Sequence, residues 1–189
     1  FQVMDTDRFL AYLNESLLTS EELRQQVNVA AWVDGKGLPA NCPGGRSTRI
    51  ESVDATLNAW VNGTTPSADL PWNDWMYQER YRFLSNLPDN TSSERLAELD
   101  QAWSINATGN NEVLFAWLEQ AVRSQHEPAY DRLRTFLVNV GRRKFLTPLY
   151  RAMLESDQRD LALDIYGQAR GNYHSVATGT MDDLLGWSE

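Results

Sequence analysis

Three consecutive cations follow a glycine in the segment Gly141-Arg142-Arg143-Lys144-Phe145. Apolar residues recur at three- and four-residue spacing on both sides of it, which predicts one amphipathic helix ending near Gly141 and another beginning at the cations. The free N–H groups and the dipole of a helix N-terminus attract anions, and Arg and Lys bind carboxylate and phosphate groups. The segment is therefore a candidate site for a carboxylate or phosphate, and the alternative is a solvated basic turn.

The charge distribution favours a small anionic ligand over a polyanion. The 189 residues carry a net charge of −9 with a pI near 4.7, which argues against nucleic acid or an anionic membrane surface as the main partner. Residues 123–151 nevertheless hold seven cations against two acids, Glu127 and Asp131, a local balance of +5. The cations are Arg123, Arg132, Arg134, Arg142, Arg143, Lys144 and Arg151. A basic island on an acidic protein suits one small anionic group.

Residues for a self-sufficient catalytic centre are missing from the sequence. His126 and His174 are the only histidines, too few for the usual zinc ligand set, and the segment from His126 departs from H-E-x-x-H at Tyr130. We expect His174 to pack in the structure or to start a helix. Cys42 is the only cysteine, so it forms no internal disulfide and no thiolate metal cluster. Nucleophile-elbow and phosphate-loop motifs are absent, so we assign no catalytic residue and no metal ligand.

Helical periodicity predicts the elements that position these side chains, and no segment alternates with period two over a convincing length. The expected helices cover residues 5–18, 20–32, 47–61, 72–87, 92–103, 112–123, 128–140, 142–153, 157–166 and 180–185. Residues 36–47 are rich in glycine and proline and are expected to be irregular. The predicted fold is all-α, with roughly nine or ten short helices in antiparallel pairs stacked as a bundle or an α-solenoid. Helix pairs of about 35 to 45 residues are compatible with a HEAT-like or armadillo-like repeat.

The apolar residues are numerous enough for one core. With 42% hydrophobic residues in 189, the chain is expected to form a single domain over residues 1–189. Five tryptophans fall on the apolar faces of expected helices and are predicted to be core residues: Trp32, Trp60, Trp75, Trp103 and Trp117. Trp72 and Trp187 are less clearly internal. No apolar run is long enough to span a membrane, and no signal-peptide pattern is present.

Four sets of residues together resemble a known family. They are Ala31-Trp32 with Gly37-Leu38-Pro39; Asn110-Asn111-Glu112 with Phe115 and Trp117; Gly141-Arg142-x-Lys144-Phe145-x-x-Pro148-Leu149-Tyr150; and Tyr173-His174-x-Val176. The third is the specific one. Along nearly its whole length the chain resembles the C-terminal α-helical domain of the zinc aminopeptidases related to leukotriene A4 hydrolase and aminopeptidase B. Ser175 stands where a proline is common in that family, which affects only the local turn.

The resemblance implies a right-handed α-superhelix of HEAT-like or armadillo-like helix pairs that packs against N-terminal and thermolysin-like catalytic domains. By position, Arg142 and Lys144 would project into the active-site cleft and hold the free C-terminal carboxylate of a short peptide, and Arg143 receives no role. The zinc would belong to the catalytic domain, so this chain would close the cleft of a zinc metallo-aminopeptidase without being catalytic itself.

Two questions stay open at the level of sequence. The same helix pairs would also suit a non-enzymatic helical-repeat module for protein interaction. The chain starts at Phe1 and is interpreted as a part of a longer protein whose targeting segment is not in this sequence, so the location, cytoplasmic or periplasmic, is left open.

Overall fold

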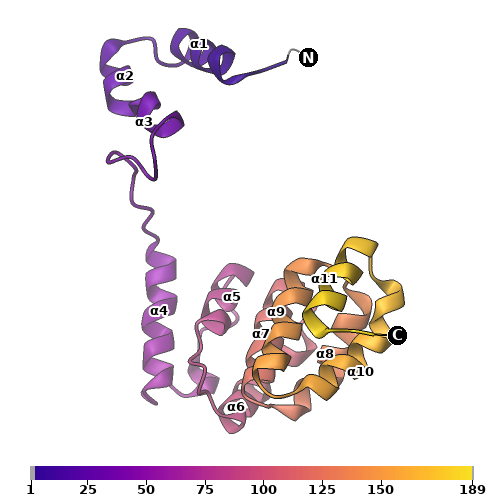
Figure 1. The fold of residues 1–189 in the computed structure, drawn as a ribbon. Coiled ribbons are helices and arrows are strands. Elements are labelled where there is room, and N and C mark those ends of the chain that lie inside the picture. The colour runs from indigo at the N-terminus through magenta and orange to yellow at the C-terminus, as the bar shows by residue number, and fades with distance from the viewer. Residues whose placement is uncertain (1–2, 189) are drawn as a thin grey trace. The chain divides into compact units, whose positions relative to one another are not determined.

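The computed structural model describes residues 3–188 and divides the chain into two compact units, residues 1–46 and 47–189. All regular structure in residues 3–188 is helical (Figure 1). It consists of eleven α-helices and four short 3-10 helices. The all-α prediction is confirmed. The number of α-helices slightly exceeds the expected nine or ten, because one expected helix is divided in two.

The first unit is a small group of three helices. These are α1 (Thr6–Ser16), α2 (Glu21–Val27) and α3 (Val29–Val33). As the sequence indicates, Asp5 and Ser20 cap α1 and α2, with side-chain oxygens that accept from backbone N–H groups. Asn28 adopts a left-handed conformation at φ 49° and separates α2 from α3, where one continuous helix was expected.

The prediction that Trp32 is a core residue is wrong, since its side chain is 43% exposed. The physical reason is the size of the unit. Leu18 is the one buried apolar residue among those described up to residue 46, so these short helices enclose no core of their own.

The second unit contains the remaining helices. They are α4 (Thr48–Val61), η1 (Ser67–Asp69), α5 (Tyr77–Ser85), α6 (Ser93–Trp103), η2 (Ile105–Ala107), α7 (Asn111–Arg123), η3 (Glu127–Ala129), α8 (Tyr130–Asn139), α9 (Arg143–Glu155), α10 (Arg159–Ala169), η4 (Arg170–Asn172) and α11 (Ser175–Leu185). Most boundaries lie within a few residues of those predicted, because the capping side chains are recognisable locally. Ser47, Ser92 and Asn110 cap α4, α6 and α7.

Three helix starts differ from the prediction. Helix α5 begins at Tyr77, because residues 71–75 turn around Pro71, and Met76 is 58% exposed instead of facing the core. Helix α10 begins at Arg159, because Asp157 has a φ of 58° and cannot open it. Helix α11 begins five residues earlier than expected, with His174 at its N-cap accepting from the N–H of Val176 at 3.3 Å.

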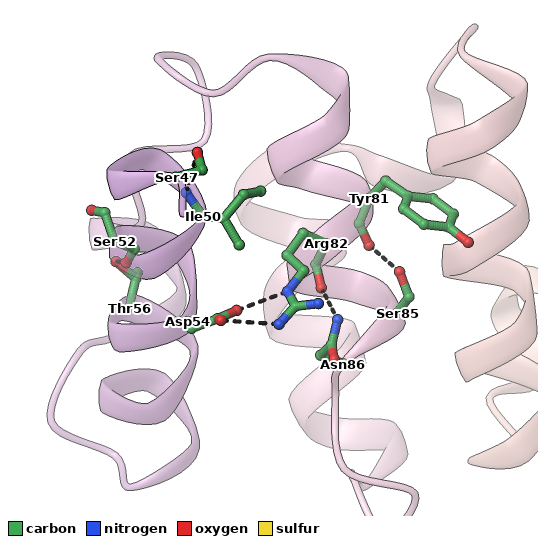
Figure 2. Close-up of polar contacts among 9 residues, drawn as sticks. All are labelled: Ser47, Ile50, Ser52, Asp54, Thr56, Tyr81, Arg82, Ser85 and Asn86. Atoms are coloured by element: carbon green, nitrogen blue, oxygen red, sulfur yellow. Dashed lines mark hydrogen bonds and ion pairs between the residues drawn. The ribbon is translucent and has the colours of Figure 1, made fainter. Parts of the chain in front are cut away.

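An ion pair joins α4 and α5, the first two α-helices of this unit. The Arg82 guanidinium on α5 binds the Asp54 carboxylate on α4 through two contacts, drawn as dashed lines in Figure 2. The two N–O distances are 2.8 and 3.0 Å. In the same view the Ser47 hydroxyl accepts from the N–H of Ile50 at the start of α4. Such a two-point pair fixes the relative orientation of both helices.

The later helices form two stacked rows. Helices α7, α9 and α11 begin at residues 111, 143 and 175, so one helix pair is added every 32 residues. Within this stack α9 packs against both α7 and α11, and α10 packs against both α8 and α9. The pairs are shorter than the predicted length, because the connections between helices contain only a few residues. The arrangement is consistent with an α-superhelix of helix pairs.

One continuous apolar core runs through the second unit. It includes Trp60 at 2%, Trp75 at 8% and Trp117 at 0% exposure, as predicted, whereas Trp103 is only partly buried against it. Trp72, which the sequence left ambiguous, is also buried, at 5% exposure. Its ring packs against Phe83 with centroids 6.3 Å apart. The basic turn between α8 and α9 is built on this core.

Candidate functional site

The basic turn connects two helices by a very short extended segment. Helix α8 ends at Asn139, Val140 follows in an extended conformation, and Arg142 is the N-cap of α9. Gly141 occupies the expected position after the helix, but it is not left-handed, unlike Gly63 and Gly186. A Cβ at Gly141 would lie 3.5 Å from the Tyr173 ring, an ordinary van der Waals distance, so the loop that precedes α11 packs beside this turn without requiring a glycine there.

The side chain of Phe145 is buried next to the cationic groups of Arg142 and Lys144. It is 1% exposed and packs against Phe115 on α7 and Phe136 on α8, with ring centroids 5.4 and 5.6 Å away. The guanidinium carbon of Arg142 lies 5.6 Å from the Phe145 ring centroid, and the Lys144 Nζ lies 5.3 Å from it. Both cations are therefore gathered around one buried ring where three helices meet.

Lys144 has a carboxylate partner on a neighbouring helix. Its Nζ lies 2.6 Å from both oxygens of Glu112, in the first turn of α7. The side chains are 52% and 29% exposed, respectively. The Oδ1 of Asn110 accepts from the backbone N–H groups of Glu112 and Val113 at 2.9 and 3.2 Å, which fixes the first turn of α7.

Arg142 differs from Lys144 in having no anionic partner. Both Arg142 and Arg143 are exposed, and within residues 3–188 neither guanidinium forms a hydrogen bond or ion pair. The N-terminus of α9 has neither a side-chain cap nor an acidic residue in its first turn. Cations at a helix N-terminus are unfavourable by about 0.3 to 1 kcal/mol each, and an incoming anion relieves that cost.

The predicted site residues are thus brought together, because the cationic groups of Arg142 and Lys144 both lie near the same aromatic ring. Sequence reasoning placed Glu112 at a helix start but missed its contact with Lys144. A signal existed in the helix spacing, since the starts of α7 and α9 are 32 residues apart and so are Glu112 and Lys144. Arg123 and Glu155, at the opposite ends of these helices, pair at 3.3 Å with the same spacing, so α7 and α9 run parallel.

The histidines have structural environments. His126 is 2% exposed, its Nδ1 lies 2.8 Å from the Ser93 hydroxyl, and its ring packs edge-on against Trp117. Burial lowers the pKa of His126 and favours its neutral form. His174 is the N-cap of α11, which confirms the prediction that it either packs in the structure or starts a helix. The part of the chain that the structure describes holds no group of three His, Cys, Asp or Glu side chains arranged for a metal ion. None of its helices is both long and apolar enough to cross a bilayer.

A comparison with known protein families shows to which family the chain is related. The family described as "Leukotriene A4 hydrolase, C-terminal" matches residues 75–185, more than half of the chain. The chain belongs to this leukotriene A4 hydrolase C-terminal family. The match runs from just before α5 to the end of α11 and so includes Glu112 and the whole basic turn.

Similarity to individual proteins is consistent with membership of the leukotriene A4 hydrolase C-terminal family. Over 156 residues the chain is 28% identical to leucine aminopeptidase 2 of Pyricularia oryzae, covering 81% of this chain and 25% of that protein. It is 24% identical to aminopeptidase RNPEPL1 of Mus musculus over 189 residues, covering 95% and 26%. The solved structure of native yeast LTA4 hydrolase matches with a TM-score of 0.80 at 23% identity, covering 97% of this chain and 33% of that one, which shows a shared fold. The chain therefore spans between 25% and 33% of the length of these relatives.

Proposed function

We propose that the chain is the C-terminal part, as one domain, of a longer zinc-dependent aminopeptidase, and that it closes the active-site cleft and binds the C-terminal carboxylate of short peptides. The observation that carries the proposal is the placement of Arg142 and Lys144 around Phe145, within the segment that matches the family. Curated relatives named as aminopeptidases support the reaction class.

The geometry suits recognition of a carboxylate. An Arg guanidinium donates two parallel hydrogen bonds to one carboxylate, and Arg142 is exposed without an anionic partner in the described chain. The Nζ of Lys144 lies 5.3 Å from the centroid of the same Phe145 ring and adds a second cation. The uncapped start of α9 adds the positive end of the helix dipole. All three features favour a single negative group at this turn.

The role of these residues is alignment. Holding the C-terminal carboxylate fixes the distance from the end of the peptide to the scissile bond, which favours short substrates and contributes through orientation. The metal would polarise the scissile carbonyl or activate water. The zinc ligands would come from the rest of the longer protein. In this chain His126 is hydrogen-bonded to Ser93 and His174 caps α11, so neither histidine fits a zinc site here.

The proposed partners are the N-terminal and catalytic domains of the same longer protein. Several large apolar side chains of residues 3–46 are exposed, among them Phe9 at 45%, Tyr12 at 59% and Leu38 at 80%. Surface of this kind is typical of a face that meets another protein body. Sedimentation of the chain mixed with the separately expressed remainder should show a complex, and two species that stay apart at every concentration would contradict docking.

Substrate chemistry tests the carboxylate site. In the full-length protein, Arg142→Ala should lower kcat/KM on free-carboxylate tripeptides by a factor equivalent to about 2 to 4 kcal/mol of transition-state binding. The same variant should lose much less on C-terminally amidated versions of those tripeptides. Arg143→Ala is the matched control, because it removes the neighbouring cation that has no assigned role. Equal losses on both substrate forms, with circular dichroism unchanged, would contradict the proposal.

The alternative of a non-enzymatic interaction module is tested by the longer protein itself. A zinc aminopeptidase carries H-E-x-x-H followed by a distant Glu, which supplies two His ligands and a general base. Reading the coding sequence upstream of Phe1 reveals whether this motif is present. Its absence would remove the enzyme proposal and leave the interaction module.

A further inference from the structure

The Glu112 carboxylate uses only part of the hydrogen-bonding capacity of the Lys144 ammonium. The ammonium has three N–H donors, and two of them are used by the Glu112 oxygens at 2.6 Å each. One donor therefore stays available for another acceptor while the Glu112–Lys144 pair remains intact. Arg142 is exposed at the same ring and offers its full guanidinium fork.

The position of Glu112 is held by the fold. Its helix is capped by Asn110, and the Phe115–Phe145 contact at 5.4 Å holds α7 and α9 together just behind the pair. At the other ends of the same helices, Arg123 and Glu155 pair at 3.3 Å. These contacts fix α7 and α9 relative to each other at both ends, so the fold sets the backbone positions from which Glu112 and Lys144 meet.

The charges around the Phe145 ring have a definite sum. Arg142 and Lys144 each contribute one positive charge, and Glu112 contributes one negative charge, so these three groups present a net charge of about +1 at neutral pH. This sum matches one carboxylate. A ligand with two neighbouring carboxylates would bring its second negative charge close to Glu112, and like charges at such range repel.

We propose that Glu112 is a specificity-determining residue of the carboxylate site, which makes the site accept peptides with one C-terminal negative charge and disfavour peptides that end in Asp or Glu. This inference rests on the proposed function, because it assumes that Arg142 and Lys144 bind the C-terminal carboxylate. Glu112 acts by its charge, and it also leaves Lys144 one free donor.

A pair of peptides that differ by one charge tests the inference. Two tripeptides with identical first and second residues, one ending in Gln and the other in Glu, are hydrolysed by the full-length protein, and the ratio of kcat/KM values is measured. Glu112→Gln should reduce the preference for the Gln-ending peptide by about threefold to fivefold, mainly through a lower KM for the Glu-ending one. Glu112→Asp keeps the charge and should keep the preference.

The matched control lies on the same helix. Glu119 pairs with Arg123 at 3.1 Å two turns further along α7, and Glu119→Gln should leave the ratio unchanged. A second measurement needs no variant: the preference of the wild-type protein should fall as salt is raised, because screening weakens repulsion between exposed charges. An unchanged ratio in folded Glu112→Gln, or a wild-type preference that is insensitive to salt, would overturn the inference.

Failure of the inference is distinguishable from failure of the proposed function. If the wild-type protein prefers free-carboxylate tripeptides over amidated ones while Glu112→Gln leaves the Gln-to-Glu ratio unchanged, the carboxylate site stands and the role of Glu112 is refuted. If the wild-type protein hydrolyses amidated and free tripeptides equally well, the carboxylate site itself is refuted, and the role of Glu112 with it.

Discussion

The hydroxyl of Tyr173 donates a hydrogen bond of 2.7 Å to the carbonyl oxygen of Leu137, which joins the loop before α11 to the last turns of α8. The same hydroxyl lies 3.1 Å from the hydroxyl of Tyr150 on α9. One buried phenol thus connects the loop before α11 to the two helices α8 and α9, next to the glycine of the basic turn. This contact explains why a tyrosine occupies a position that sequence inspection identified only as a family anchor.

Alkaline pH should destabilise the second unit through its buried tyrosines. Burial raises the pKa of Tyr173 to about 12, and burial also raises the pKa of Tyr150 and Tyr166 above the ordinary value. Above pH 10 the unfolded chain loses these protons while the folded chain keeps them, so stability is full below pH 10 and is lost as pH rises towards 12. Tyr173 alone should contribute a loss of about 1 kcal/mol at pH 11.

Chemical denaturation at pH 8, 10 and 11 measures this effect. Tyr173→Phe should be less stable at pH 8 by about 1 kcal/mol, because the carbonyl of Leu137 loses its donor, but its decline above pH 10 should be shallower. A wild-type stability that stays level up to pH 11 would contradict the prediction.

Acid pH should weaken the contact between α10 and α11. The Arg170 guanidinium binds Asp182 through two contacts of 3.0 Å, and the Tyr166 hydroxyl donates to the same carboxylate at 2.6 Å. The bonds from Arg170 and Tyr166 lower the pKa of Asp182. Stability from this carboxylate is present above its ordinary pKa near 4 and is lost as pH falls below that value. Asp182→Asn should flatten the acid side of the stability profile, and a profile identical to that of the wild type would refute the role.

Gly141→Ala should be tolerated, although glycine stands in the segment most specific to the family. Its backbone is not left-handed, and the added Cβ would meet the Tyr173 ring at an ordinary 3.5 Å, so the free energy of unfolding should change by less than about 0.5 kcal/mol. Gly186→Ala is the matched control. Gly186 has a φ of 58°, and alanine there should cost about 1 kcal/mol or more. Thermal unfolding of both variants ranks them, and an equal loss would show that Gly141 needs its backbone freedom.

Phe145→Ala should be severely destabilising. The ring is 1% exposed and contacts phenylalanines of α7 and α8, so its removal should cost about 3 to 5 kcal/mol through lost burial and a cavity. Phe145→Leu fills most of the space and should cost less. Denaturant unfolding gives both values. A cost below 1 kcal/mol for the alanine variant would mean that the three helices are held together elsewhere.

Local interactions made much of the fold readable from the sequence. The periodicity of apolar residues marks a helix through contacts three and four residues apart, and Asp5, Ser20, Ser47, Ser92 and Asn110 cap their helices through bonds to backbone groups two or three residues away. The proximity of Arg142 to Lys144 was equally predictable, since both belong to one helix start. Sequence alone therefore determined the all-α class and the position of the basic turn.

Only the tertiary structure decided which distant residues complete that turn. Glu112 reaches Lys144 because α7 and α9 run parallel, and this arrangement depends on packing around Phe145 across 32 residues of chain. Packing also buries Trp72 and leaves Trp32 exposed, although both are equally apolar. The spacing of a side chain along its own helix fixes which face it occupies, but what that face meets depends on contacts between segments far apart in sequence.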